Sequence, residues 1–313
     1  MEQPLAEVQD QTATASASQD DRPTTVAPSL QPAAQTVSPQ ACASCGTAPA
    51  TNGGAADSPS HIYAIGRIEP RFPSISVEKE FAQATGRADS KGLTDRQTLQ
   101  AVLSKPENRY LARQLCWVVT IEGLETYILV PRDPADISLL VEALRPTPQP
   151  WDLDVVIGRK GPVAPPTMCN GLMVPIVVFD QIYSFDRDSL IKAIPKPEKT
   201  SAKEFAPAAE ELFDRIMQMT DNAGATDEHR ALNYCALRYQ TIYGKAADCF
   251  GMNSSLTAVD VSASPLSGTR NVVDVVFSYT NRNTDVTEKY FCRVDVTEEF
   301  PFLVTKLSPY YDR

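Results

Sequence analysis

The sequence predicts an α+β protein, in which a mixed α/β N-terminal module is followed by a helical pair packed on a small antiparallel sheet. Three patterns lead to this fold class. Between residues 61 and 199, stretches with the two-residue apolar period of strands alternate with stretches of helical spacing. Two strong helical patterns follow residue 200, and the last sixty residues return to the strand period. Helices and strands segregated in this way are typical of the α+β class.

The first sixty residues differ in composition from the rest of the chain. They consist largely of Ala, Thr, Ser, Gln and Pro and contain no aromatic side chains. Such a segment buries too little apolar surface to offset the entropy lost on ordering. We therefore expect residues 1–60 to form a disordered tail, which is either a tether or docking arm or a passive extension.

The module at residues 61–199 is expected to begin with a strand whose two faces are both fairly apolar. Pro70 and Pro73 are expected to end this strand, and the Pro-rich passage from Gly161 to Pro166 is expected to be a loop. Helices are predicted where apolar residues recur at three-four spacing behind a capping Ser or Thr, such as Thr94. The predicted elements are, in order, strand 61–68, helices 76–86, 94–104 and 107–115, a hairpin of strands 116–121 and 126–130, helix 136–144, and strands 153–157 and 174–179.

A second module is predicted for residues 200–313. The segment Ile194–Thr200 mixes proline with charge, which stiffens and solvates a chain, so we place a module boundary near residue 200. Helical spacing from Phe205 to Ile216 and from Leu232 to Ile242 predicts two antiparallel helices. The strand period then predicts a hairpin of residues 273–279 and 290–296, flanked by strands 256–261 and 302–307.

Charge and cysteine usage narrow the class of protein. The chain has 29 Lys and Arg against 39 Asp and Glu, a formal net charge of -10, which argues against nucleic acid as a partner. Seven scattered cysteines, an odd number, do not form the disulfide framework of a secreted protein. The N-terminus lacks the pattern of an export signal, and the longest apolar run, Leu172–Phe179, is too short for a bilayer span. We expect a cytoplasmic protein with no membrane partner.

The sequence offers few residues for catalysis. Its only two histidines, His61 and His229, could each be a general base or a surface residue. No phosphate-binding glycine loop, nucleophile elbow or zinc-protease motif occurs. We expect the carboxylate pairs Asp152 with Asp154 and Glu298 with Glu299 to be solvated surface charge. No catalytic residue is predicted.

Cys42 and Cys45 form the one compact group of possible metal ligands. Two thiolates at this spacing converge on one ion and can supply half of a tetrahedral zinc site. No second pair follows, so the remaining ligands would come from distant residues or a partner. The alternatives are a redox pair or two unengaged thiols. A structural zinc ion is therefore the one cofactor that the sequence leaves open.

Charged residues near the start of the first module could form a recognition surface. Arg67, Glu69 and Arg71 occur at two-residue spacing, which sets them on one side if the strand extends past Pro70. A charged strand edge could bind an extended peptide by strand addition, whereas the same residues could form internal ion pairs that brace strand and helix. Arg230 and Arg238, eight residues apart on one predicted helix, could each contact an acidic partner or be solvated.

The stretch His61–Arg87, HIYAIGRIEPRFPSISVEKEFAQATGR, follows a Cys-Ala-Ser-Cys and resembles a known domain. It is similar to the opening of the C-terminal domain of unknown function in the PatG and PatA proteins of cyanobactin biosynthesis, which also occurs in maturation proteins of other ribosomally made peptides. The resemblance covers roughly Cys42–Tyr243 and is strongest from Tyr63 to Gly86. That domain is appended to proteases and macrocyclases without an assigned catalytic residue, so the resemblance transfers no active site.

The resemblance and the scarcity of catalytic residues lead to one functional hypothesis and two rivals. The first is a non-enzymatic accessory protein that binds the leader of a precursor peptide in the biosynthesis of a ribosomally synthesised, post-translationally modified peptide. Its partners would be the precursor peptide and the maturation enzymes of the same gene cluster. The rivals are a metal-dependent tailoring enzyme of the same pathway, which would use Cys42 and Cys45, and a scaffold that binds only partner enzymes.

Overall fold

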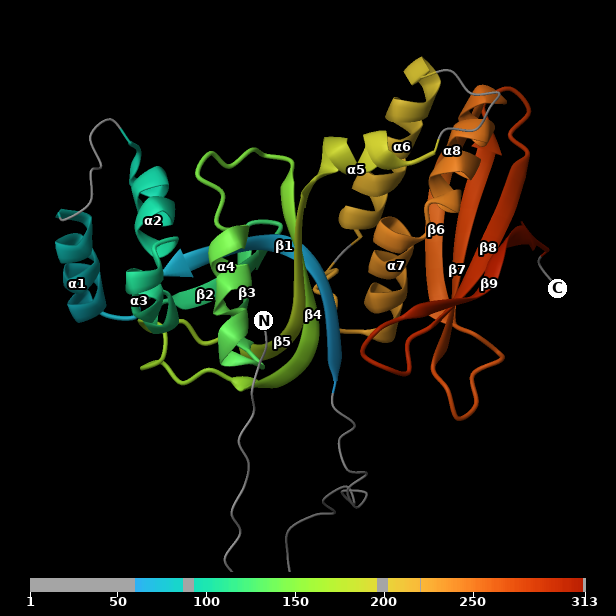
Figure 1. Cartoon of the computed structure of the whole chain (residues 1–313). Helices are drawn as coiled ribbons and strands as arrows, with labels where there is room; N and C mark the ends of the chain where they lie inside the picture. Colours follow the sequence, from blue (N-terminus) through green and yellow to red (C-terminus); the bar gives the residue numbers. More distant parts are fainter. Residues whose placement is uncertain (1–59, 87–92, 196–201, 220, 312–313) are drawn as a thin grey trace, which may run out of the picture. The chain divides into compact units, whose positions relative to one another are not determined.

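The computed structural model describes residues 60–86, 93–195, 202–219 and 221–311, which belong to one compact unit. In this part of the chain, eight α-helices accompany nine strands that form two sheets (Figure 1). The predicted α+β class is therefore confirmed. All but the last residue of the predicted tail, and residues 196–200 of the predicted boundary segment Ile194–Thr200, lie outside the described residues. The division into modules at residue 200 stays a prediction.

The first sheet is a closed five-stranded barrel. Its strands follow the order β1-β2-β3-β5-β4, and all neighbours are antiparallel except β3 and β5. The sequence pattern predicted each of these strands but not their closure into a barrel. The strands are β1 His61–Arg71, β2 Cys116–Ile121, β3 Leu124–Pro131, β4 Asp152–Val163 and β5 Pro175–Asp186.

Strand β1 closes the barrel because its two halves pair with different neighbours. Residues 61–66 pair with β4, and residues 67–71 pair with β2. Gly66 lies where the strand passes from one partner to the other, and a Cβ atom there would lie 2.6 Å from the main-chain oxygen of Thr120. The close approach of the two backbones therefore requires glycine at this position.

The expectation that Pro70 ends the first strand is wrong. Pro70 pairs with Trp117 inside β1, and the strand continues to Arg71. The N–H of Ile68, two residues earlier, points towards β4 and donates to Asp154. Residues two apart in a strand point their N–H groups to the same side, so an N–H at Pro70 would also face the β4 side. Pro70 lies beyond the residues of β1 that pair with β4, so its missing N–H costs no hydrogen bond between strands.

Gly158 in β4 provides a stringent test of the barrel register. It lies at an irregularity between β4 and β5, where a Cβ atom would overlap the main-chain oxygen of Val178 and lie 2.6 Å from the Cα atom of Phe179. We expect Gly158→Ala to lower the free energy of unfolding by about 2 kcal/mol, measured by urea denaturation, because backbone atoms must move. Gly161→Ala, three residues along, is the control, since its nearest neighbour would be at an ordinary 3.4 Å. Equal stabilities of the two variants would show that this register is wrong.

Helices join the barrel strands and cover part of the barrel. Thr94 begins α2 with a capping box: its hydroxyl accepts the N–H of Gln97, and the Gln97 side chain accepts the N–H of Thr94. The indole N–H of Trp117, buried in the barrel core, donates to Ala112. These helices are α1 Ile75–Gly86, α2 Asp95–Leu103, α3 Arg109–Gln114 and α4 Ile137–Ala143. Gly161 to Val163, expected to be loop, instead continue β4.

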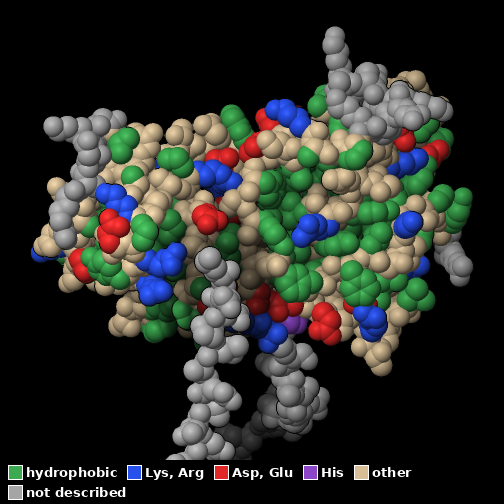
Figure 2. All heavy atoms as spheres, in the orientation of Figure 1, with side chains coloured by type: hydrophobic (Ala, Val, Ile, Leu, Met, Phe, Trp, Pro, Cys, Tyr) green, Lys and Arg blue, Asp and Glu red, His purple; other side chains and the backbone are tan. Residues whose placement is uncertain are grey.

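The second sheet is a four-stranded antiparallel sheet in the order β6-β7-β8-β9. Its inner face shares an apolar core with helices α6 to α8. Figure 2 shows many apolar side chains on the half of the visible face that holds these helices and the second sheet, and more frequent charged side chains on the barrel half. The elements are α5 Arg187–Ala193, α6 Ala202–Met217, α7 Asp227–Arg238, α8 Thr241–Gly251, β6 Ser254–Ala263, β7 Val272–Asn281, β8 Thr287–Asp295 and β9 Phe302–Tyr310.

The predicted helical pair is in fact three helices. The helical spacing that predicted one helix up to Ile242 is interrupted, because α7 ends at Arg238 and α8 begins at Thr241. Tyr239, between them, leaves the helical conformation, and its hydroxyl accepts the main-chain N–H of Leu307 at 2.7 Å. Leu307 belongs to β9, the last strand of its sheet. The break in the helix therefore supplies a hydrogen-bond partner to an edge strand.

Segment 222–238 contacts the barrel through strand β1. The N–H of Tyr63 donates to Gly224 at 2.9 Å, and the amide of Asn233, which also exchanges hydrogen bonds with Asn222, donates to the oxygen of Tyr63 at 2.8 Å. Gly224 has a φ of 71°, and a Cβ atom there would lie 2.6 Å from the Cα atom of Ala64. These contacts fix α7 against the first half of β1.

Candidate functional site

The structure places the three predicted charged residues of β1 at alternate positions, as their spacing indicates. Arg67 and Glu69 are exposed, and Arg71 is half-buried. Strand addition at these residues is disfavoured. Residues 67–71 pair with β2 on one side; on the other side the N–H of Ile68 donates to Asp154 and Pro70 has no N–H, so few main-chain donors remain for an added strand.

Two of these three residues form ion pairs within the molecule. Glu69 pairs with Arg96 of α2 at 3.2 Å, and Arg71 pairs with Glu125 of β3. This is the bracing arrangement that the sequence left open as the alternative to peptide recognition. Both pairs are partly exposed, where such pairs contribute about 0–1 kcal/mol to stability. Their charges are engaged before any ligand arrives.

Arg67 differs from its two neighbours. Its guanidinium donates to the main-chain oxygen of Pro150 and forms no ion pair with any described residue. The side chain lines two hollows, of about 490 and 240 Å³, which also share Glu69 and Pro150. We refer to these two hollows together as the Arg67 site.

The larger hollow combines apolar walls with charged groups. Strand β1, the start of β4 and helix α6 contribute the apolar side chains, namely Ile65, Trp151, Leu153, Phe213 and Met217. Trp151 is 40% exposed. Arg187 and Asp214 form an ion pair at 3.0 Å in the wall, and Glu122 comes from the turn between β2 and β3. Residues far apart in the sequence therefore converge on this hollow.

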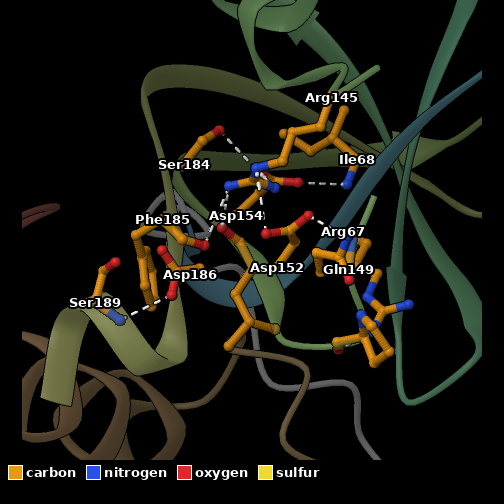
Figure 3. A network of polar contacts seen from close by, with 12 residues as sticks. Arg67, Ile68, Arg145, Gln149, Asp152, Asp154, Ser184, Phe185, Asp186 and Ser189 are labelled. Atoms are coloured by element: carbon orange, nitrogen blue, oxygen red, sulfur yellow. Dashed lines mark hydrogen bonds and ion pairs between the residues drawn. The ribbon is translucent and has the colours of Figure 1, made fainter. Parts of the chain in front are cut away.

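A buried polar network supports the segment that carries Pro150 and Trp151 (Figure 3). The guanidinium of Arg145 lies 3.6 Å from Asp152 and 3.6 Å from Asp154, and it donates to the main-chain oxygen of Phe185 at 3.1 Å. Asp152 accepts the N–H of Gln149 at 2.7 Å. The network closes the chain from residue 145 to residue 154 into a fixed loop. It thereby holds the carbonyl to which Arg67 donates.

Asp154 is the most enclosed member of this network, with 2% of its surface exposed. It accepts the N–H of Ile68 at 2.8 Å and the hydroxyl of Ser184 at 2.6 Å. Burial raises the pKa of Asp154, although these hydrogen bonds and Arg145 oppose the shift. The expectation that Asp152 and Asp154 are solvated surface charge is wrong, because Arg145 accompanies both carboxylates into the interior.

Arg238 lies apart from the Arg67 site. Its guanidinium carbon is 5.2 Å from the centre of the Tyr183 ring, and it donates to the Tyr183 hydroxyl at 3.3 Å. Burial raises the pKa of the nearby Tyr63 to about 12, and Arg238 opposes that shift. Arg238 does not line either hollow, so the structure does not bring it together with Arg67. Its contact with a peptide stays a prediction.

The described residues contain no group of three His, Cys, Asp or Glu side chains placed to hold a metal ion. Cys42 and Cys45, the predicted zinc ligands, lie outside them. His61 and His229 are half-buried, and burial is the main cause that lowers the pKa of each imidazole. Neither histidine lines the Arg67 site.

The buried cysteines form two pairs that the sequence pattern did not indicate. The thiols of Cys235 on α7 and Cys292 on β8 are 3.6 Å apart, and Cys116 of β2 contacts Cys169. Burial and the contact with Cys169 raise the pKa of Cys116 to about 12. The pKa of Cys235 is also raised, by the contact with Cys292 and by burial; because the thiolate is the reactive form, Cys116 and Cys235 are unreactive at neutral pH.

A carboxyl pair connects the barrel to the loop before β9. Glu299, 8% exposed, lies within hydrogen-bonding reach of Asp180 on β5, and each carboxyl group retains one buried oxygen without a partner among the described residues. Arg159 lies 3.4 Å from Glu299, and Arg132 pairs with Asp180. Burial, followed by Asp180, raises the pKa of Glu299. The expectation that Glu299 is solvated is therefore wrong.

This pair predicts a specific pH dependence of stability. The folded protein keeps a proton on Glu299 to a higher pH than the unfolded chain, so stability is present below the ordinary carboxyl pKa of about 4 and falls as the pH rises through the raised pKa. The slope reaches at most about 1.4 kcal/mol per pH unit for one proton. We expect Asp180→Asn to reduce this change of the unfolding free energy with pH, as measured by urea denaturation from about pH 4 to about pH 8.

His61 titrates in part of this range and contributes a slope of the opposite sign, because its pKa is lowered in the folded state. The Asp180→Asn comparison is therefore made in a His61→Gln background. Asp154 contributes equally to both curves and cancels. Parallel stability curves in the two proteins would show that no proton is shared between Asp180 and Glu299.

Comparison with known proteins supports the resemblance found in the sequence. The model of the PatG C-terminal family matches residues 199–310. A solved structure described as the PatG domain of unknown function superimposes with a TM-score of 0.66 at 19% sequence identity, over 81% of this chain and 99% of that one. No curated protein matches the chain. The similarity to the PatG-type domain is confirmed, and the structural likeness establishes a shared fold.

The extent of the match differs from the sequence-based expectation. The resemblance was placed at Cys42–Tyr243, whereas the family model matches residues 199–310, so the two ranges share only residues 199–243. The structural match covers more of the chain than the family model and therefore includes part of the first 198 residues. Among the described residues, no helix has the length and apolar composition that crossing a bilayer would require.

Proposed function

We propose that this chain is a non-enzymatic accessory protein that binds the leader of a precursor peptide during the biosynthesis of a ribosomally synthesised, post-translationally modified peptide. It acts in the cytoplasm and presents the core of the precursor to maturation enzymes of the same gene cluster, which form and break the bonds. The match to the PatG C-terminal family supports the choice of pathway. The choice of ligand is supported by the Arg67 site.

The observation that carries the proposal is a guanidinium without a carboxylate partner at the junction of two hollows. Arg67 donates to one main-chain oxygen, and the other N–H groups of a guanidinium remain available to a ligand. The larger hollow, about 490 Å³, has the size of a typical small-ligand site, and a peptide side chain or two would fill it. Apolar walls beside a cationic group suit the side chains of a peptide.

The mode of binding follows from the barrel. Because residues 67–71 of β1 offer few main-chain donors on the side away from β2, a peptide would bind by placing side chains into the Arg67 site rather than by adding a strand to the barrel. A flexible leader loses entropy when it orders, which limits the affinity. We therefore expect a dissociation constant of about 1–100 μM, which allows the processed peptide to leave.

The test is calorimetric titration of the full chain with synthetic peptides. The probes are the leader and core halves of a short precursor peptide, which is to be sought in the open reading frames beside this gene. We expect heat of binding with the leader and none with the core alone. Mass spectrometry of the precursor after incubation with the purified chain should show no change of mass. Absence of leader binding would contradict the proposal, and a change in precursor mass would favour a tailoring enzyme instead.

A further inference from the structure

We infer that the Arg67 site selects a peptide segment in which an acidic side chain, bound by Arg67, is accompanied by a large apolar side chain that enters the larger hollow. This inference rests on the proposed function, because it concerns the same site. It adds the chemical class of the residues that are recognised. Two independent properties of the site support it, namely the distribution of charge and the composition of the wall.

The arginines that line the two hollows are not equivalent. Arg96 pairs with Glu69 at 3.2 Å, and Arg187 pairs with Asp214 at 3.0 Å. Arg145 is held between Asp152 and Asp154. Arg67 alone among these four forms no ion pair with a described residue.

A carboxylate is the group that best complements the unpaired guanidinium of Arg67. Its contact with Pro150 places the guanidinium at the hollows and leaves most of its donors free. A carboxylate can accept two parallel hydrogen bonds from such a group, which gives both energy and orientation. A neutral amide of the same shape accepts only weaker hydrogen bonds. The site should therefore distinguish Glu from Gln at this position of the peptide.

The carboxylates around the site limit where a second acidic side chain could be placed. Glu69, Asp152, Asp154 and Asp214 pair with three arginines, and Arg145 serves two of them, so these four carboxylates outnumber their cations by one. Glu122, which also lines the larger hollow, forms no ion pair with a described residue. An acidic side chain near Glu122 would be repelled. A single acidic residue at Arg67 is therefore favoured over an acidic run.

The wall of the larger hollow calls for an apolar neighbour of that acidic residue. Phe213 and Ile65 are buried, so they form a fixed floor, whereas Met217 and Leu153 are half-buried. Trp151 is partly exposed and can cover a bound side chain. A methionine in the wall adapts to side chains of different shape, which suits a Leu, Met or Phe of the ligand.

The site contains its own spectroscopic reporter. The chain has two tryptophans: Trp117 is 2% exposed in the barrel core, whereas Trp151 lines the larger hollow. A ligand that covers Trp151 should shift its fluorescence emission to shorter wavelength, with Trp117 as a constant background. The Trp151→Phe variant identifies the signal, because it should abolish the shift.

The experiment uses the full chain and blocked hexapeptides of the sequence Ser-Gly-Glu-Leu-Gly-Ser. Single replacements give relatives with Gln or Lys for Glu, and with Ala for Leu. We expect the Glu-Leu peptide to bind most tightly, at least tenfold weaker binding with Gln, still weaker binding with Lys, and about tenfold weaker binding with Ala. Arg67→Gln should remove the difference between Glu and Gln while leaving the difference between Leu and Ala.

Arg71→Gln is the matched control. Arg71 lies on the same strand, four residues from Arg67, but pairs with Glu125 and lines neither hollow. This variant should bind all hexapeptides as the wild type does. Because Arg67 is exposed, Arg67→Gln should unfold at the same urea concentration as the wild type, and a shift of that midpoint would attribute the lost binding to misfolding and overturn the inference.

The outcomes separate this inference from the proposed function. If the leader binds but Arg67→Gln binds it equally well, the inference is wrong and the function stands. If the hexapeptides bind through Arg67 but no leader binds, the inference stands and the function is wrong. No fluorescence shift with any hexapeptide at millimolar concentration, or equal binding of the Glu and Gln peptides, overturns the inference.

Discussion

Replacing Arg145 with methionine is expected to lower the free energy of unfolding by about 3 kcal/mol. The guanidinium lies 3.6 Å from both Asp152 and Asp154, and both carboxylates are buried. Its removal leaves two buried charges without a cation and the main-chain oxygen of Phe185 without its donor. In urea denaturation, the unfolding midpoint should fall while the dependence of the unfolding free energy on urea concentration stays as in the wild type.

Restoring charge balance provides the control for this prediction. Adding Asp152→Asn and Asp154→Asn to Arg145→Met removes the uncompensated charges, so the triple variant should be more stable than the single one. Arg145→Met should also weaken peptide binding at the Arg67 site, because Pro150 and Trp151 lie on the segment that Arg145 fixes through Asp152. A stability loss below about 1 kcal/mol would show that the network is not what holds this loop.

Arg230→Met is the second substitution with a large expected effect, a loss of about 3–4 kcal/mol. Arg230 is 3% exposed and donates to the main-chain oxygens of Val296 at 2.6 Å, Glu299 at 3.3 Å and Glu298. Methionine fills most of the volume but removes the donor of three main-chain oxygens, two of them in buried hydrogen bonds and one in a partly buried hydrogen bond. The unfolding midpoint in urea should fall accordingly.

Arg238→Met supplies a control on the same helix. Arg238 is eight residues further along α7 and stacks on Tyr183 at the surface, where such contacts contribute about 0.5–1 kcal/mol. If the two variants lose equal stability, the buried hydrogen bonds of Arg230 do not hold the loop between β8 and β9. From the sequence, Arg230 and Arg238 had the same interpretation, whereas in the structure only Arg230 is buried.

Local patterns predicted most of the elements and little of their arrangement. The apolar periods placed the four helices around the barrel close to their observed bounds and located the strands of both sheets, although β4 and β5 continue well past the predicted ends at residues 157 and 179. Closure of the barrel was not predictable in this way, because it depends on close approaches between distant segments, such as Gly66 against Thr120. The parallel pairing of β3 with β5 likewise joins strands that are not consecutive.

The candidate site was predictable in one residue and not in its surroundings. The spacing of Arg67, Glu69 and Arg71 indicated their alternate positions on a strand, but which of them keeps a free charge depends on Arg96 and Glu125, from distant parts of the chain. A carboxylate pair at two-residue spacing, Asp152 and Asp154, looks the same in sequence whether water or Arg145 solvates it. The preceding Arg145 was the one available signal.

The hydroxyl of Tyr239 affects whether the sheets of two copies of the chain can pair along their edges. It occupies the N–H of Leu307 on the outermost strand of the second sheet, and Pro309, two residues along, has no N–H to offer. A neighbouring copy that aligned alongside residues 307–309 would therefore find no free main-chain donor at Leu307 or Pro309, so edge-to-edge pairing of two sheets at this end of β9 is disfavoured.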